Sequence, residues 1–213
     1  MEYQLLAGLT DDDRRAVLAA AVRRRFKRGE VVFHEGDLGD TFHHIARGKV
    51  AVRVSTPAGD VATVAVLVRG DGFGEHALLE PDSRRMASVI ALEATETIVL
   101  SHGQFEELRS AHPTVNDLLI DHLVRQVRRL TEHYTDALFL PAEQRVLKRV
   151  LELDDLYGGG EIALTQDDLA TIAGTTRPTA NRALQRLIDA GQVAASRGRL
   201  RVLDRPALER RAR

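Results

Sequence analysis

The chain contains Gly72-Phe73-Gly74-Glu75-His76-Ala77-Leu78-Leu79, followed after a short gap by Arg85-Met86-Ala87-Ser88-Val89-Ile90-Ala91. Glycines let backbone amides approach an anion closely, and an arginine offers a planar fork of donors to phosphate oxygens. A carboxylate such as Glu75 accepts a hydrogen bond from a ribose hydroxyl. The segment therefore predicts a nucleotide-binding loop. The alternative is a simple ion pair between Glu75 and Arg85 in a fold that binds nothing.

The residues before and after this segment predict β-structure. Eight of the 16 glycines fall between Gly29 and Gly74, and Gly48, Gly59 and Gly70 follow one another at intervals of 11 residues. In residues 49–54 valine alternates with other residues, which is the period of a strand with one buried face. Regular short strands separated by turns are typical of an antiparallel barrel or jelly roll. We predict an all-β unit over residues 26–100.

A long helix is predicted downstream. Its apolar positions are spaced four and three residues apart: Leu123, Val127, Leu130, Tyr134 and Ala137, extended upstream by Val115 and Leu119. Such a seam either packs on its own domain or pairs with the same helix of a second copy, and about three heptads do not decide between them. Pro141 ends or kinks the helix, which makes residues 138–142 a hinge.

The charge of the chain is unevenly distributed. The 213 residues carry 30 basic and 31 acidic side chains, a net charge of −1. Residues 141–213 hold 13 basic against 10 acidic side chains, or +3, which leaves −4 for residues 1–140. From Thr165 onward the balance is 10 against 5. The neutral total conceals a basic carboxyl-terminal end.

Within this basic end the sequence predicts two short helices joined by a tight turn. Thr165 is a capping residue with Asp168 as its reciprocal carboxylate, Ala170 is small where a second helix crosses, and Gly174 permits the turn. Thr176 is expected to cap the second helix, which Arg177 and Pro178 open. One face of that helix is apolar, formed by Ala180, Ala183, Leu184, Leu187 and Ile188.

The opposite face of the second helix is polar, formed by Arg177, Asn181, Arg182, Gln185 and Arg186. Arg, Asn and Gln are the side chains that pair with base edges in the major groove. Residues 192–196 and 199–203 flank Arg197-Gly198 and predict a two-stranded wing whose Arg197, Arg199 and Arg201 meet phosphates. The alternative is a solvated helical hairpin with incidental arginines.

Two of these motifs resemble a known family. The segment from Gly72 to Ala91 resembles the phosphate-binding cassette of cyclic-nucleotide-binding domains, and Arg177-Pro178-Thr179-Ala180-Asn181-Arg182-Ala183-Leu184 resembles the recognition helix of the CRP/FNR (cyclic-AMP receptor protein-like) transcription regulators. The resemblance covers nearly the whole chain. It implies an α+β fold: a cyclic-nucleotide-binding β-roll (residues 1–112), a dimerisation helix and hinge (113–140), and a winged helix-turn-helix (141–213).

The resemblance also implies partners and site residues. Cyclic AMP is the expected effector, with Glu75 at the ribose 2′-hydroxyl and Arg85 at the cyclic phosphate. The effector set is Gly74, Glu75, His76, Ala77, Arg85, Met86, Leu130 and Thr131. The DNA-contacting set is Thr165, Thr176, Arg177, Pro178, Thr179, Asn181, Arg182, Arg186, Arg197 and Arg199. The expected partners are double-stranded promoter DNA and a second copy of the chain, with RNA polymerase as a further partner that the family allows.

Some residues depart from the family pattern. Cyclic-AMP-binding members carry a small or hydroxyl residue after the cassette arginine, where this chain has Met86. The family places a Thr-Ser pair of the long helix against adenine, and a gapless match puts Leu130 and Thr131 there. Two lost polar contacts cost about 1 to 3 kcal/mol each. A different effector, or none, is therefore the alternative to cyclic AMP.

Other classes of function find less support in the sequence. The chain has no cysteine, which excludes iron–sulfur clusters and cysteine-ligated zinc. We interpret His43, His44 and His76 as surface or turn histidines and expect no metal or haem. No catalytic spacing, signal peptide or membrane span is recognisable, so we expect a cytoplasmic protein that is not an enzyme. A nucleotide-binding module that acts through protein partners is the second hypothesis.

Overall fold

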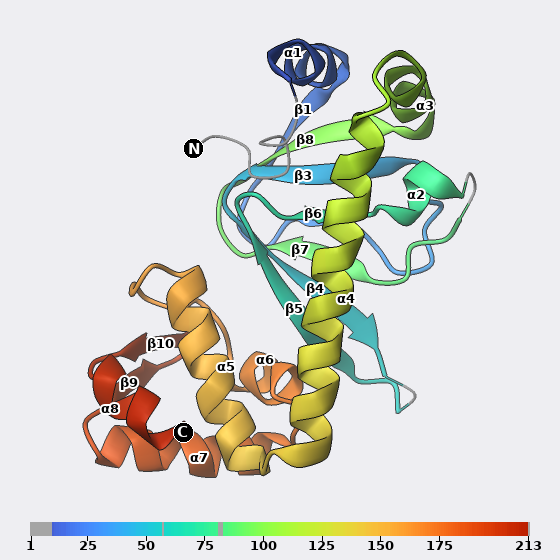
Figure 1. The fold of residues 1–213 in the computed structure, drawn as a ribbon. Helices are drawn as coiled ribbons and strands as arrows, with labels where there is room; N and C mark the ends of the chain where they lie inside the picture. The colour runs from blue at the N-terminus through green and yellow to red at the C-terminus, as the bar shows by residue number, and fades with distance from the viewer. Residues whose placement is uncertain (1–9, 57, 81–82, 213) are drawn as a thin grey trace. The chain divides into compact units, whose positions relative to one another are not determined.

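The computed structural model describes residues 10–56, 58–80 and 83–212. The chain divides into two compact units, one formed by Met1–Val61 and Ala65–Arg129 and the other by Ala62–Val64 and Leu130–Arg213. Figure 1 shows the elements of both units along the chain. Each unit is described by itself. In the described part of the chain, no helix combines the length and the apolarity that a membrane crossing requires.

The first unit is built on two four-stranded sheets. Its elements are α1 (Asp11–Ala20), β1 (Val22–Phe26), β2 (Val31–Phe33), β3 (Thr41–Arg47), β4 (Lys49–Ser55), β5 (Val61–Val68), β6 (Gly72–Phe73), α2 (His76–Leu79), β7 (Ser88–Ala91), β8 (Thr95–Ser101), α3 (His102–Ala111) and the first half of α4 (Val115–Phe139). The strand orders are β1-β8-β3-β6 and β2-β7-β4-β5, and the described pairings are antiparallel. The predicted all-β unit is confirmed, and its sheets include three strands that the sequence analysis did not anticipate: β1, β3 and β6.

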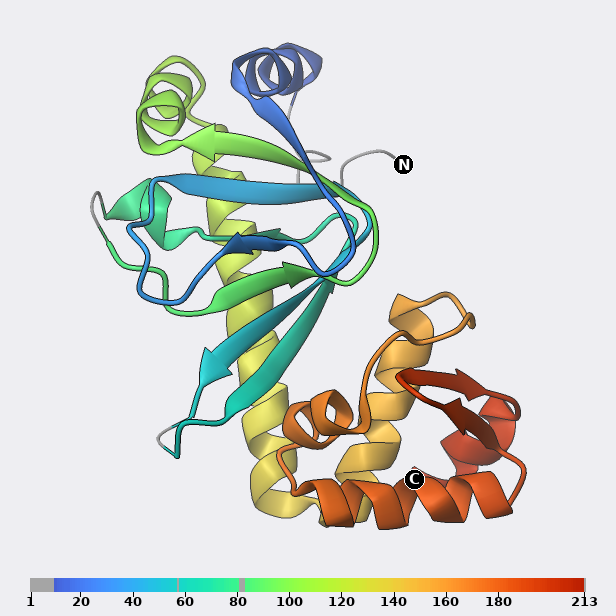
Figure 2. The same cartoon turned by 180° about the vertical axis from the view of Figure 1, so that it is seen from behind.

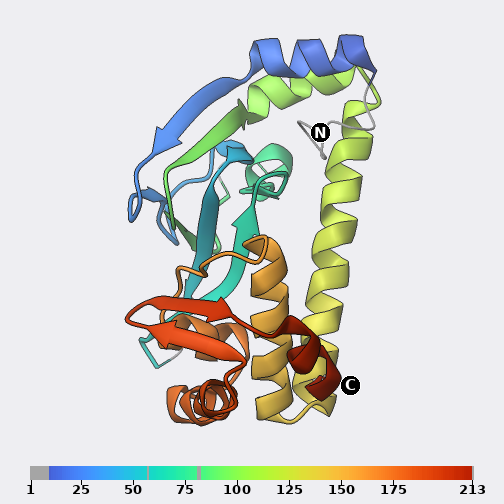
Figure 3. The ribbon, with the colours of Figure 1, turned by 90° about the vertical axis from the view of Figure 1, so that its left-hand side faces the viewer.

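The two faces of the β3 sheet pack differently. Ile45 of β3 lies in an inner core with Val50, Leu67, Phe73 and Val89, whereas Phe42 packs outward. The outer core joins Phe42 to Leu100 of β8 and to five residues of α2, α3 and α4: Leu78, Phe105, Leu108, Val115 and Leu119. Figure 3 shows α3 and the start of α4 beside this sheet. Successive side chains of β3 therefore alternate between the roll interior and the helices.

The second unit is a helical domain with a small hairpin. Its elements are the end of α4, then α5 (Ala142–Leu156), α6 (Gln166–Ile172), α7 (Arg177–Asp189), β9 (Val193–Ser196), β10 (Arg199–Val202) and α8 (Arg205–Arg211). β9 and β10 pair antiparallel, and Figure 2 shows this hairpin following α7. The break predicted at Pro141 is confirmed, because α4 ends at Phe139 and α5 begins at Ala142. The α+β fold with a carboxyl-terminal helix-turn-helix is confirmed.

Candidate functional site

The glycines of the cassette are required by their surroundings. Gly74 has a φ of 82°, and a Cβ there would lie 2.6 Å from Nη1 of Arg85 and 2.9 Å from the carbonyl oxygen of Thr41. A Cβ on Gly72 would lie 2.4 Å from the ring of Phe42. Only glycine tolerates both the left-handed backbone and the close approach. The cassette backbone is therefore packed directly against the arginine that the sequence analysis selected.

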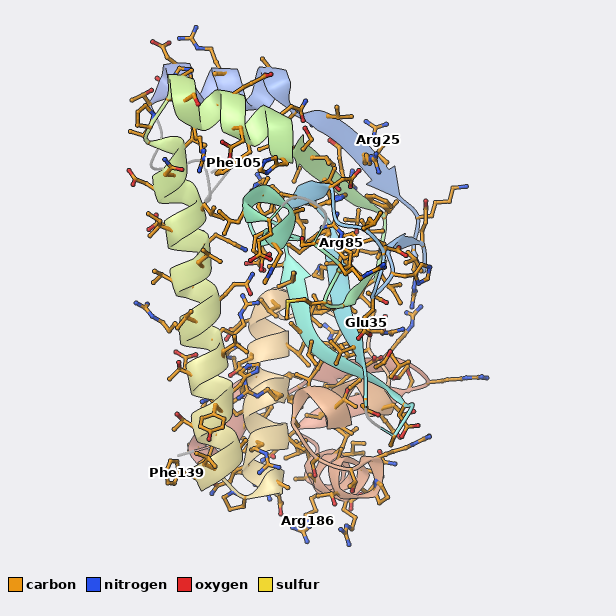
Figure 4. The ribbon with its side chains drawn as sticks, turned by 90° about the vertical axis from the view of Figure 1, so that its right-hand side faces the viewer. Arg25, Glu35, Arg85, Phe105, Phe139 and Arg186 are labelled. Carbon is orange, nitrogen blue, oxygen red and sulfur yellow. The ribbon has the colours of Figure 1, made fainter. Side chains whose placement is uncertain are left out.

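Arg85 is buried inside the first unit, with 7% of its surface exposed. Figure 4 shows it among the strands, whereas Arg25 lies on the outside of β1. Its guanidinium stacks over the Phe33 ring, 4.1 Å from the ring centroid, and Nη2 donates to Oγ1 of Thr41 at 2.9 Å. Nη1 reaches the Gly74 carbonyl oxygen at 3.4 Å. Burial lowers the pKa of Arg85 from its ordinary value, an effect that nearby carboxylates oppose.

The carboxylate that lies within ion-pair distance of Arg85 is exposed to solvent. Asp40 lies 3.7 Å away and its side chain is 84% exposed. Nε of Arg85 is buried and has no hydrogen-bond partner among the described residues. An unpaired buried donor on a cationic side chain has capacity for an anion.

Glu75 is held by the long helix. Nε2 of Gln126 donates to Oε1 of Glu75 at 3.1 Å, and Nε2 of His122 lies 3.6 Å from Oε2. Burial raises the pKa of Glu75, but the contact with His122 and the backbone amide outweigh it, so the net pKa is lowered and the carboxylate is charged. No ion pair between Glu75 and Arg85 is present in the described part of the chain. Each of the two groups has its own hydrogen-bond partners.

The interpretation of His43 and His44 as surface or turn residues is wrong. Both lie in β3 and are 1% and 4% exposed, because the sequence analysis did not recognise this strand. Burial, with Arg85 as the next cause, lowers the pKa of His43 to about 3. Burial also lowers the pKa of His44 to about 4. Among the described residues, no group of three or more side chains is placed to hold a metal ion.

The remaining residues of the predicted effector set are spread out. Ala77 is buried in α2 and its amide donates to the Gly74 carbonyl oxygen at 3.2 Å, whereas His76 is exposed. Met86 is 69% exposed, so its side chain lies outside the buried cluster around Arg85. Leu130 is 67% exposed and Thr131 is also exposed, both on α4. The structure thus brings together Gly74, Glu75 and Arg85 at the cassette, but not Met86.

The apolar residues of the long helix differ in their surroundings along its length. Val115, Leu119 and Leu123 pack against their own unit, which confirms the first of the two predicted alternatives for this part of the helix. The exposed row begins one residue after the predicted seam, at Ile120 in place of Leu119 and Val124 in place of Leu123. Its members follow at alternating intervals of four and three: Ile120, Val124, Val127, Thr131, Tyr134 and Leu138. This row has the spacing of a coiled-coil seam.

The predicted helix-turn-helix is present in the second unit. Thr165 caps α6 by accepting from the amide of Asp168, whose carboxylate in turn accepts from the amide of Thr165. Gly174, with a φ of 58°, lies in the turn. Thr176 occupies the N-cap position of α7, but its side chain accepts no capping hydrogen bond, and its hydroxyl donates to Thr179.

α7 presents the polar face that the sequence predicts. Ala180, Ala183, Leu184 and Leu187 are buried, whereas Pro178, Arg177, Arg182 and Arg186 are exposed. Arg177 lies 3.3 Å from Asp167, Arg182 donates to Oγ1 of Thr179, and Arg186 pairs with Glu143. Figure 4 shows Arg186 projecting outward. Asn181 differs, because its side-chain oxygen is buried and has no described hydrogen-bond partner.

The predicted wing is confirmed as the β9–β10 hairpin. Arg199 pairs with Ser196 across the hairpin, and Gly198 has a φ of 69° in the turn. Leu200 is buried, whereas Arg197, Arg199 and Arg201 are exposed. Arg199 forms an ion pair with Glu161. The hairpin offers positive side chains on one surface.

Two residues at the cassette were missed by the sequence analysis. His122 and Gln126 continue the row of α4 residues that begins with Val115 and Leu119, at intervals of three and four. This row faces the first unit, and it places His122 and Gln126 at Glu75. The spacing was the available signal, but the sequence analysis assigned ligand contacts on this helix only to Leu130 and Thr131.

Comparisons with known proteins agree with this geometry. A family model described as cyclic nucleotide-binding domain matches residues 23–112, and one described as Crp-like helix-turn-helix domain matches residues 144–211. The chain is 31% identical over 205 residues to the cyclic AMP receptor protein of Thermus thermophilus, covering 96% of this chain and 94% of the relative.

Solved structures are similar over most of the chain. The catabolite activator protein of Thermus thermophilus matches with 31% identity and a TM-score of 0.57, covering 98% of both chains. The c-di-GMP responsive global regulator CLP of Xanthomonas campestris matches with a TM-score of 0.76, covering 91% of this chain and 99% of the other. Its identity is 20%, so this likeness concerns the fold alone.

Proposed function

The chain belongs to the CRP/FNR family of DNA-binding transcription regulators and carries a cyclic nucleotide-binding domain; from this membership we propose that it acts as a homodimer controlled by cyclic AMP, and not as an enzyme. The proposal divides it into an effector domain (1–112), a dimerisation helix with hinge (113–140) and a DNA-binding domain (141–213). Its expected partner is promoter DNA, with RNA polymerase as a further one.

The observation that carries the proposal is the state of Arg85. A buried guanidinium normally has carboxylate partners, because an isolated buried charge is costly. Arg85 instead has a hydroxyl, a long contact to a carbonyl and an exposed carboxylate at 3.7 Å, and its Nε has no described partner. A cyclic phosphate would supply the missing acceptors.

Family likeness is what favours cyclic AMP over a larger nucleotide as the effector. The relative with 31% identity bears the name cyclic AMP receptor protein, whereas the c-di-GMP responsive relative supports only the fold. Gly74 and Arg85 offer a phosphate site, and the charged Glu75 offers an acceptor for a ribose hydroxyl. Ligand chemistry beyond phosphate and ribose depends on residues such as Thr131.

The proposed control runs through α4. Glu75 accepts from Gln126 of this helix, so a ribose hydroxyl that binds Glu75 competes for an acceptor that α4 uses. The exposed seam of α4 pairs two copies of the chain, and each copy then presents one α7 to successive major grooves of a roughly palindromic site. Arg177, Arg182 and Arg186 of α7 are the exposed side chains that read bases or hold phosphates.

Calorimetry with cyclic AMP tests the effector. We expect saturable binding to the wild-type protein and its loss in Arg85→Gln. Arg84→Gln is the matched control, because Arg84 is the exposed neighbour that donates to the Gly36 carbonyl oxygen. No heat and no thermal stabilisation at millimolar cyclic AMP would reject this effector, and cyclic di-GMP and cyclic GMP are then titrated in the same way.

A mobility-shift assay on genomic fragments tests the DNA-binding part. We expect salt-sensitive binding that cyclic AMP strengthens and that Arg182→Ala weakens in a sequence-dependent way. Arg210→Ala, an exposed arginine at the end of α8, is the control. Failure to bind any fragment, with or without nucleotide, would instead favour the module that acts through protein partners.

A further inference from the structure

A chain of polar side chains runs through the first unit beneath Arg85. Nη2 of Arg85 donates to Oγ1 of Thr41 at 2.9 Å. Oγ1 of Thr41 lies 3.3 Å from Nε2 of His43, and Nδ1 of His43 lies 3.2 Å from Oγ1 of Thr97. His43 and Thr97 are 1% and 0% exposed, so the chain leads from the cassette arginine into the buried interior.

The direction of each hydrogen bond follows from the donors available. Arg85 can only donate, and Thr41 uses its one hydroxyl hydrogen toward Oδ1 of Asp40 at 3.0 Å. Oγ1 of Thr41 must then accept from His43, which requires the hydrogen on Nε2. Nδ1 of His43 is left as the acceptor for the hydroxyl of Thr97. This arrangement satisfies both ring nitrogens in the neutral Nε2–H tautomer.

Aromatic side chains also contact the His43 ring and the Arg85 guanidinium. The His43 ring is stacked on Phe73 with centroids 5.0 Å apart and an interplanar angle of 11°, and it meets the edge of Phe33 at 5.9 Å. Phe33 also lies under the guanidinium of Arg85 at 4.1 Å. The arginine is thus held between a π face and a hydroxyl, and both of these groups contact His43.

We propose that His43 is a positioning residue of the effector site, which orients the phosphate-binding guanidinium of Arg85 through Thr41 and Phe33. The inference rests on the proposed function for the role of Arg85 in binding an anionic phosphate. His43 itself touches no ligand. A neutral ring suits this role, because a second cation beside Arg85 would oppose the charge that the anion needs, and the pKa of His43 is far below neutrality.

The first test needs no ligand. Long-range ¹H–¹⁵N spectra of the full-length protein with labelled histidine report the tautomer and charge of each ring. We expect His43 to be neutral from pH 8 to pH 5, with the hydrogen on Nε2, and this pattern to change in Thr41→Val. A ring that is protonated near pH 6 to 7, or that carries its hydrogen on Nδ1, would overturn the proposal whether or not cyclic AMP binds.

The second test measures cyclic AMP affinity by calorimetry in a double-mutant cycle. Thr41→Val is expected to weaken binding about tenfold, the size of one hydrogen bond to a charged group, whereas Thr41→Ser should stay within about twofold of wild type. His43→Leu should weaken binding several-fold in the wild-type background and add little in the Thr41→Val background, because His43 acts on the arginine through Thr41. An equal loss in both backgrounds would show a merely structural role and overturn the proposal.

The two tests separate this inference from the proposed function. If the wild-type protein binds no cyclic AMP while His43 shows the expected tautomer, the effector assignment fails. The orientation of Arg85 is then followed in NMR spectra through the signals of its guanidinium group. Those signals should lose their restricted rotation in Thr41→Val and regain it in Thr41→Ser. Unchanged signals in Thr41→Val would contradict the positioning role.

Discussion

Each of the two units contains a buried arginine, and the two arginines differ in how their charge is balanced. Arg149 of α5 is 3% exposed and pairs with Asp136 and Glu152, two carboxylates of its own unit. Arg85 is 7% exposed and stacks on Phe33, donates to Thr41 and lies 3.7 Å from the exposed Asp40. Removing a buried guanidinium that has its own buried carboxylates leaves those charges without a partner, whereas one held mainly by neutral groups is available to an external anion.

The buried carboxylates of the two units also differ in their partners. Asp136 also accepts from Lys148 at 2.7 Å, so two cations share one buried carboxylate. Burial raises the pKa of Glu152, which the adjacent Arg149 opposes. At the cassette, the charged Glu75 is held by Gln126 and His122 and not by Arg85. The second unit thus neutralises its buried charges internally, while the first keeps a cation and an anion separated.

The largest effect is expected from removal of the fully paired arginine. Arg149→Met leaves Asp136 buried with only Lys148 as partner, and breaking a buried pair costs about 3 to 5 kcal/mol of unfolding free energy. Denaturation of the full-length protein, followed by hydrogen exchange in α5 peptides, measures this loss. Lys148→Met, whose side chain is 40% exposed, is the control and should cost less than about 1 kcal/mol. Equal losses in the two variants would contradict the comparison.

Much of the second unit could be predicted from local sequence signals. The cap at Thr165, the turn at Gly174, the buried face of α7 and the wing around Gly198 all depend on residues a few positions apart. Local propensity and spacing determine such features before any tertiary contact forms. Two local predictions failed: the side chain of Thr176 makes no capping hydrogen bond, and the side-chain oxygen of Asn181 is buried.

The first unit was predicted less completely, because its site depends on contacts between distant residues. The cassette glycines, Glu75 and Arg85 are a local motif, but Thr41 reaches Arg85 across 44 residues and Gln126 reaches Glu75 across 51. β3 was missed because its run Thr-Phe-His-His-Ile-Ala-Arg places polar residues on both faces. Because two of its buried residues are histidines, the strand does not show the alternation of apolar and polar residues by which strands are recognised.

The second-largest difference between the two units is expected in how their stability responds to acid. The folded-state pKa values of His43 and His44 are about 3 and about 4, below the ordinary value of 6.5. Because the unfolded state binds more protons below pH 6.5, both residues stabilise the fold above that pH, and this contribution is lost as the pH falls toward the folded-state values. At pH 5 we expect a loss of about 2 kcal/mol for each histidine.

Hydrogen exchange at pH 7 and pH 5, corrected for intrinsic rates, locates this loss. Peptides of β3 and β8 should lose protection, whereas peptides of α5 should lose less, because the raised pKa of Glu152 means that its protonation favours the folded state. His43→Gln should remove part of the dependence, and His34→Gln, an exposed histidine, should not. An equal loss of protection in the peptides of both units would contradict the proposed difference in how their buried charges are compensated.

A smaller effect is expected at Gly74, the glycine that packs against Arg85. Gly74→Ala forces alanine into a φ of 82° and places its Cβ 2.6 Å from Nη1 of Arg85. The left-handed backbone alone costs about 1 to 2 kcal/mol, and the displaced guanidinium should abolish cyclic AMP binding. Gly103→Ala is the control, since that position in α3 has open space around it and a helical backbone. Retained nucleotide affinity in Gly74→Ala would contradict the close packing of cassette and arginine.

The smallest effect on stability is expected from removal of Arg85 itself. Arg85→Met leaves no carboxylate buried without a partner, because Asp40 is 84% exposed and Glu75 has its own partners. The methionine side chain retains the contact with Phe33, and the desolvation of a cation is relieved. The unfolding free energy measured at pH 8 should therefore change by less than about 1 kcal/mol, in either direction. A loss comparable to that of Arg149→Met would show that Arg85 is a structural cation, and would remove the reason to assign it to a ligand.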